Sequence, residues 1–146
     1  VLYSLFIILR VVYFRHTYNL QKDFAEWAAS TTSPSGVIIA LDEADFLRYY
    51  TPREIISRPI TCEEKKIDEY FRDVLERYRS EGRSVYIIST ALDVYDPCHT
   101  FRRMLYREYN VIPLGARVNE DWHHKSVRQG LFYEFLYTIE KRNEKK

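Results

Sequence analysis

The sequence predicts an α/β fold, a mostly parallel sheet flanked by helices, and three observations support it. Residues 37–41 form a short apolar run, rich in β-branched residues, that follows the turn-forming residues 33–36. Residues 84–89 form a second run of this kind, and a helical pattern lies between the two. Strands buried on both faces are typical of parallel sheets, and parallel strands need a crossover helix. The three segments therefore predict a strand–helix–strand unit.

The composition indicates a single globular domain. The chain has 146 residues, of which 46% are hydrophobic, and this is enough for a sizeable core. The net charge of +1 neither indicates nor excludes a nucleic-acid partner. The apolar opening, residues 1–14, is interrupted by Arg10 and is too short to span a bilayer. We expect a mostly buried helix over residues 2–18, with a strand over residues 6–14 as the alternative.

The helix between the two apolar runs has the clearest pattern. Thr61 and Glu64 are spaced as a capping box, and Gly82 is suited to end the helix. Between them, apolar residues recur at helical spacing: Ile67, Tyr70, Phe71, Val74, Leu75 and Tyr78. Residues 48–59 contain two prolines and no clean period, so we expect an excursion or a lid-like loop there.

The remaining segments give weaker signals. Residues 20–29 predict a short amphipathic helix, and residues 100–109 predict a short basic helix. Residues 110–114 predict a third strand, which Pro113 places at a sheet edge or at a strand end. Residues 131–139 fit either a last strand or a helix.

Cysteine and histidine residues suggest no special chemistry. Cys62 and Cys98 lie far apart and form no CxxC pair, so we expect reduced thiols in a cytoplasmic protein. His123 and His124, even with Cys98 and His99, lack the spacing of zinc ligands, and we expect surface histidines.

Polar residues follow both apolar runs at the point where each strand is expected to end. Asp42, Glu43 and Asp45 follow the first, and Ser89 and Thr90 close the second. Open α/β sheets bind ligands at the carboxyl ends of their strands. We therefore expect Asp42, Glu43, Ser89 and Thr90 to cluster at one edge of the sheet.

This order of residues resembles the back half of a P-loop ATPase. It is most similar to the zonula-occludens-toxin-like proteins and the DNA-pumping ATPases of the FtsK–HerA type, which include viral packaging ATPases. Asp42-Glu43 matches the end of a Walker B strand, and Ser89-Thr90 matches the end of a sensor strand. Asp96-Pro97, followed by Arg102 and Arg103, matches a segment that supplies an arginine at a subunit interface. The resemblance covers about residues 36–114.

The resemblance implies a role for each matched residue. Asp42 would organise Mg²⁺ and Glu43 would polarise the attacking water, because phosphoryl transfer depends on positioning and charge neutralisation. Ser89 and Thr90 would reach the γ-phosphate of ATP. Arg102 and Arg103 would stabilise the transition state in a neighbouring subunit's site. The implied cofactors are ATP and Mg²⁺, and the implied partners are further copies of this chain and DNA.

Two features depart from the family pattern. Ala91 stands at the position of the sensor glutamine, which weakens the case for γ-phosphate sensing. No G-x-x-x-x-G-K-[ST] motif, whose amides and lysine cradle phosphate, occurs in the sequence. Either residues 1–146 are a single-domain fragment without the first strand and P-loop, which we favour, or they are a degenerate member. We expect this chain alone not to hydrolyse ATP.

Two other functions stay open. The chain could be a non-catalytic scaffold or interaction subunit that keeps a nucleotide-binding fold. It could also be a magnesium-dependent nuclease that uses the acids after the first strand with Glu63, Glu64 and Lys65. The acids of that triplet lie at an expected helix start, where the helix dipole favours them without any catalytic role.

Overall fold

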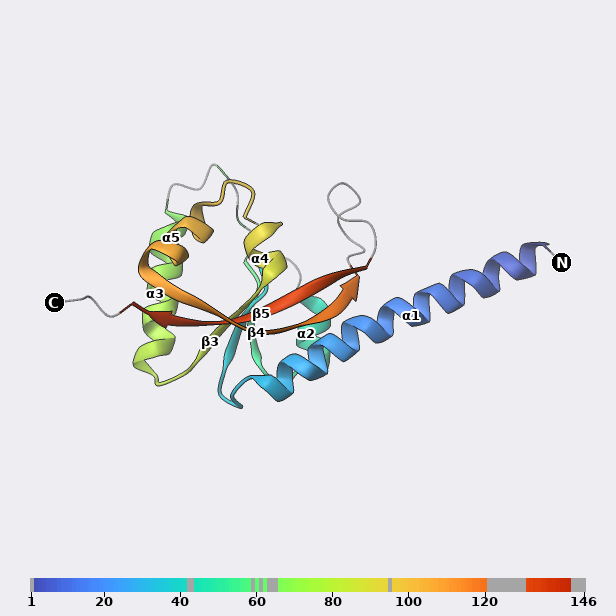
Figure 1. Cartoon of the computed structure of the whole chain (residues 1–146), viewed down its shortest axis with the longest axis horizontal. Helices are drawn as coiled ribbons and strands as arrows, with labels where there is room; N and C mark the ends of the chain where they lie inside the picture. The colour runs from blue at the N-terminus through green and yellow to red at the C-terminus, as the bar shows by residue number, and fades with distance from the viewer. Residues whose placement is uncertain are drawn as a thin grey trace.

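The computed structural model describes residues 2–41, 44–58, 60, 62, 66–94, 96–120 and 131–142. Its helices and strands alternate over most of the chain (Figure 1). In order they are α1 (Leu2–Thr31), β1 (Val37–Ile39), α2 (Asp45–Tyr50), β2 (Glu54–Ile56), α3 (Ile67–Ser80), β3 (Val85–Ile88), α4 (Ser89–Asp93), α5 (Thr100–Glu108), β4 (Tyr109–Glu120) and β5 (Leu131–Lys141).

The five strands form one mixed sheet in the order β2-β1-β3-β5-β4. Strands β2, β1 and β3 are parallel, whereas β5 is antiparallel to both β3 and β4. The α/β class is confirmed, but the prediction of a mostly parallel sheet is wrong. The reason lies between Glu120 and Leu131, where the connection is too short for the crossover that a parallel pair needs.

Strands β1 and β3 are both central, as predicted. Every residue of the two strands is buried, and their register places Val37 opposite Val85 and Ile39 opposite Ile87. Such short strands are stabilised by apolar burial on both faces, which explains why Val and Ile make up both strands apart from Tyr86.

The two helices expected before β1 are one continuous helix, α1. Its C-terminal half is packed against the body, where Phe24 and Ala28 are fully buried and the Phe24 ring lies 6.1 Å from that of Phe46. Its N-terminal half projects away from the sheet (Figure 1), and the side chains of Leu5 and Ile8 are 55% and 58% exposed. The helix over residues 2–18 is confirmed and the alternative strand is wrong. The expected burial is wrong for the side chains described in this stretch, which are Leu5, Ile7, Ile8 and Leu9.

The length of α1 explains this exposure. A helix of 30 residues is about 45 Å long, and only its C-terminal half packs against α2 and β4. Within the described part of the chain, no helix is long and apolar enough to cross a bilayer, which agrees with the sequence expectation.

Residues 48–59 are not the expected lid-like loop. Helix α2 continues to Tyr50, and Glu54–Ile56 form β2, an edge strand parallel to β1. The backbone of Ile55 and Ile56 pairs with Ile38 and Ile39, so a short apolar dipeptide between two prolines is enough to add a strand. Pro52 lies before β2, so it removes no donor from the pairing with β1.

Helix α3 ends where the sequence predicts but starts later. It begins at Ile67 with Lys66 as the N-cap residue, so the predicted capping box does not mark its start, and Thr61 and Glu64 lie outside the described residues. At its C-terminus, the amides of Gly82 and Arg83 donate to the carbonyl oxygens of Arg79 and Tyr78, both at 2.9 Å. This is a Schellman motif, and the φ of +70° at Gly82 is the left-handed conformation that it requires.

Helices α3 and α5 pack together on one side of the sheet (Figure 1), where the rings of Phe71 and Phe101 stack with centroids 4.0 Å apart. The prediction of α5 is confirmed. Strand β4 is an edge strand, as Pro113 predicted, with a β-bulge between Pro113 and Gly115. Residues 131–139 belong to β5, so the strand alternative is correct there.

Candidate functional site

The carboxyl ends of β1 and β3 lie side by side, because the two strands are adjacent, parallel and in register at Ile39 and Ile87. After β1 the buried residue Leu41 has a φ of +53°, which is uncommon for a residue other than glycine. Strained backbone of this kind is often found at functional sites. Asp42 and Glu43 come next in the sequence but lie outside the described residues, so their predicted clustering with Ser89 and Thr90 stays a prediction.

Ser89 and Thr90 form the first turn of α4, directly after β3, and both are buried. The Ser89 hydroxyl donates to Oε1 of Glu134 at 2.6 Å, and the Thr90 amide donates to the same oxygen at 2.9 Å. The Ser89 oxygen also accepts from the amide of Phe135 at 3.0 Å. Glu134 is fully buried, and a buried carboxylate is stable only when donors of this kind satisfy it.

The side chain of Glu134 therefore occupies the Ser89 hydroxyl, one of the two hydroxyls that the family resemblance assigns to a γ-phosphate. The Thr90 hydroxyl is buried without a hydrogen-bond partner among the described residues, so one donor is still available there. A phosphate at this place would stand beside the Glu134 carboxylate, and two negative charges so close repel each other. The described residues do not by themselves fit an ATP phosphate.

Glu134 was not among the site residues predicted from the sequence. In a strand, alternate residues share a face, so Glu134 lies on the same face as the buried residue Leu136. The signal that could have revealed it is a glutamate two residues before a core leucine, inside a run of aromatic residues, because that spacing places both on one face of a strand. It was missed because residues 131–139 fit a helix and a strand equally well.

The two arginines assigned to a neighbouring site make contacts within this chain. Nη1 of Arg102 lies 2.9 Å from Oδ1 of Asp93, and its guanidinium lies 5.8 Å from the centre of the Tyr106 ring. Nη2 of Arg103 donates to the carbonyl oxygen of Cys98 at 3.2 Å. Arg103 is exposed and Arg102 is half-buried, so both are near the surface of α5.

The turn at Asp96-Pro97 has a structural role. The fully buried carboxylate of Asp96 accepts from the amides of Thr100 at 3.1 Å and of Arg102 at 2.7 Å, which are unpaired donors of the first turn of α5. His99, the N-cap residue, has a φ of +53° and contributes no side-chain cap. The predicted turn is confirmed, and its acid holds the start of the arginine-bearing helix.

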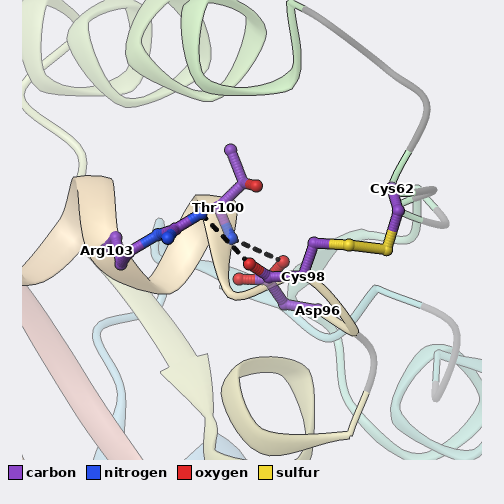
Figure 2. Close-up of a disulfide and its surroundings, with 5 residues drawn as sticks. All are labelled: Cys62, Asp96, Cys98, Thr100 and Arg103. Atoms are coloured by element: carbon purple, nitrogen blue, oxygen red, sulfur yellow. Dashed lines mark hydrogen bonds between the residues drawn. A yellow bond between two sulfur atoms is a disulfide. The ribbon is translucent and has the colours of Figure 1, made fainter.

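Cys62 and Cys98 form a disulfide, so the expectation of reduced thiols is wrong. Figure 2 shows the bond joining the segment before α3 to the turn before α5, next to Asp96 and Thr100. The packing of α3 on α5 explains it, because the stacked rings of Phe71 and Phe101 bring the starts of the two helices together.

The metal hypotheses find no support in the described part of the chain. No group of three or more His, Cys, Asp or Glu side chains that could hold a metal ion occurs among those residues. Residues 63–65, which the nuclease hypothesis requires, and His123 and His124 lie outside this part. Cys98 is bonded to sulfur and cannot serve as a zinc thiolate.

Comparison of the chain with models of protein families, with curated proteins and with solved structures finds no match. The resemblance to DNA-pumping ATPases therefore depends on the residues and on the arrangement of β1 and β3.

Proposed function

We propose that this chain is the C-terminal part of an ATP-hydrolysing motor that translocates, packages or exports DNA. The observation that supports it best is the pairing of β1 with β3 as adjacent, parallel, central strands. This pairing brings the backbone that leads into Asp42-Glu43 beside the backbone that leads into Ser89-Thr90. An acid pair and a hydroxyl pair at neighbouring strand ends are the arrangement that the resemblance requires.

In this proposal Asp42 would be the residue that holds Mg²⁺ and Glu43 the residue that orients water, and Arg102 and Arg103 would act in the site of a neighbouring copy. The amides and lysine of a P-loop must come from outside residues 1–146, since the sequence contains no such motif. The motor works as a homo-oligomer on DNA in the cytoplasm. Disulfides are rare in the cytoplasm because it is reducing. The Cys62–Cys98 bond therefore agrees with that location only if it is a redox-sensing bond or if the compartment is oxidising.

ATP turnover tests the proposal. The 146-residue chain should show no steady hydrolysis and only weak binding of Mg²⁺-ATP. A longer natural form of the protein that carries a P-loop should hydrolyse ATP, and Glu43→Gln should lower its kcat by about 100-fold or more, the usual contribution of a general base. Glu54→Gln, a substitution on β2 that also removes a carboxylate, is the matched control. Hydrolysis by the longer form that Glu43→Gln leaves unchanged would contradict the proposal.

A second candidate is a non-catalytic assembly subunit, and the bonding of Glu134 to Ser89 and Thr90 favours it. In such a subunit the carboxylate takes the place of the phosphate permanently. Equilibrium binding of Mg²⁺-ATP to the longer form discriminates the two functions. The motor requires binding that Glu134 does not prevent, whereas the assembly subunit predicts no binding by the wild type.

A further inference from the structure

An open groove of about 950 Å³ lies between α3, α5 and the outer ends of β4 and β5. It is at the opposite end of the sheet from Ser89, because its residue Lys141 lies beyond the pairing of Ile139 with the first residue of β3, Val85. Three acidic side chains and Tyr109 line it together with five basic residues, which are Arg72, Arg79, Arg107, Lys141 and Arg142.

The first carboxylate of the groove, Glu108, is shared by two guanidinium groups. Arg72 donates to both of its oxygens, at 2.8 and 3.0 Å, and Nη2 of Arg107 lies 2.6 Å from Oε1. Arg72 and then Arg107 hold the pKa of Glu108 at about 2, so the group is ionised at neutral pH. Nη2 of Arg72 also lies 3.2 Å from Oδ2 of Asp68, so two negative charges accompany the two positive charges here.

The second carboxylate, Glu76, repeats this pattern. Nζ of Lys141 lies 2.8 Å from its Oε1, and Nη1 of Arg79 lies 4.0 Å from the same oxygen. The hydrogen bond from Lys141 is the main cause of the lowered pKa of Glu76. The hydroxyl of Tyr109 lies 3.4 Å from Oε1, and burial raises the pKa of Tyr109 to about 12.

A fifth cation, Arg142, lies at the end of the groove. Its Nε donates to the carbonyl oxygen of Tyr109, and its amide donates to the carbonyl oxygen of Glu108, both at 3.2 Å. Asp73 is the remaining acid of the lining, so five basic side chains are accompanied by three acids of the groove and by Asp68, which pairs with Arg72. The two shared carboxylates also hold four of the cations in place, which reduces the entropy lost when a ligand binds.

We propose that this groove binds the phosphate backbone of a nucleic acid. Arginine is well suited to this ligand, because its planar guanidinium can donate two parallel hydrogen bonds to one phosphate. The side chains of Arg79 and Arg107 are more than half exposed, so their outward-facing donors can reach a ligand. The inference rests on the proposed function in one respect, which is that the nucleic acid is DNA.

Fluorescence anisotropy with a labelled DNA strand, single or duplex, tests the proposal without any nucleotide present. The triple variant Arg79→Gln, Arg107→Gln, Arg142→Gln should bind at least about 10-fold more weakly at 50 mM salt. The slope of log Kd against log salt should fall by about one for each phosphate that the protein no longer neutralises. Arg77→Gln is the matched control, because Arg77 lies on α3 outside the groove and its guanidinium donates to the Tyr78 hydroxyl. It should change the affinity less than twofold.

Three outcomes would overturn the inference. They are no DNA binding by the wild-type chain at 50 mM salt, equal binding by the triple variant, and equal losses in the triple variant and in Arg77→Gln.

Inorganic phosphate is the second probe. If it binds at millimolar concentration with loss in the triple variant while DNA does not bind, the groove takes a small anion and the inference fails. Because no assay uses ATP, failure of the proposed hydrolysis leaves the DNA result unaffected.

Discussion

The hydroxyl of Ser89 and the carboxylate of Glu134 form a 2.6 Å hydrogen bond in the interior of the protein. It connects the end of β3 to β5, the neighbouring strand in the sheet. The same carboxylate accepts the Thr90 amide, so one side chain fixes the direction in which the chain leaves β3. Any ligand that uses Ser89 must compete with this bond.

Glu134→Ala should destabilise the fold. It leaves the Ser89 hydroxyl and the Thr90 amide buried without an acceptor, and each unsatisfied group costs about 1–3 kcal/mol. We expect a loss of about 2–4 kcal/mol in the free energy of unfolding, measured by urea denaturation. Glu134→Gln keeps a carbonyl acceptor and should cost less. Glu140→Ala, an exposed position on the same strand, should be nearly neutral. Equal effects at positions 134 and 140 would refute the structural role.

Reducing the Cys62–Cys98 disulfide should lower stability, because the bond closes a loop over a sequence separation of 36 in the unfolded chain. The entropy of loop closure predicts about 3–4 kcal/mol for a loop of this size. Urea denaturation with and without dithiothreitol measures the difference. The double variant Cys62→Ser, Cys98→Ser should match the reduced protein and should not respond to dithiothreitol. A midpoint that reductant leaves unchanged in the wild type would exclude a stabilising disulfide.

The Arg72–Glu108 pair should make stability fall in acid. Arg72, with a smaller contribution from Arg107, lowers the pKa of Glu108 from 4.5 to about 2 in the folded state, so ionised Glu108 stabilises the fold fully above about pH 4.5. This contribution is lost as the pH falls from about 4.5 toward 2. Both side chains are about one-third exposed, so solvent screening limits the contribution to about 1 kcal/mol.

Comparing the wild type with Glu108→Gln over pH 2–7 checks this effect. The difference in unfolding free energy should be about 1 kcal/mol at pH 7 and should vanish near pH 2. Glu69→Gln, an exposed position on α3, should show no such dependence. A Glu108→Gln difference that is constant across the range would mean that the ion pair is not its source.

The sequence was informative wherever a local pattern decides the structure. The buried runs at β1 and β3 and the glycine-terminated helix α3 were all predictable. Hydrophobic periodicity and turn-forming residues determine structure within a few neighbouring residues. The edge position of β4 also followed from Pro113, because proline has no backbone N–H to donate to a neighbouring strand.

The other elements depend on distant partners that a local pattern does not reveal. Strand β2 is formed by three residues whose stability comes from pairing with β1. The antiparallel direction of β5 is set by its pairing with β3 and β4. Glu134 and the disulfide follow from the same tertiary packing. The acid pair of the candidate site, Asp42 and Glu43, was predicted from sequence and stays a prediction.

The projecting half of α1 should mediate self-association. Leu5 and Leu9 lie one turn apart on the same side of the helix and are 55% and 58% exposed, and exposed apolar patches of this kind mark interaction sites. We expect the wild type to form concentration-dependent oligomers in sedimentation velocity, and Leu5→Glu, Leu9→Glu to shift them toward monomer. Ser30→Glu, exposed near the packed end of α1, should leave the oligomers intact. A wild type that sediments as a monomer at about 100 μM, near the weak end of specific association, would contradict the expectation.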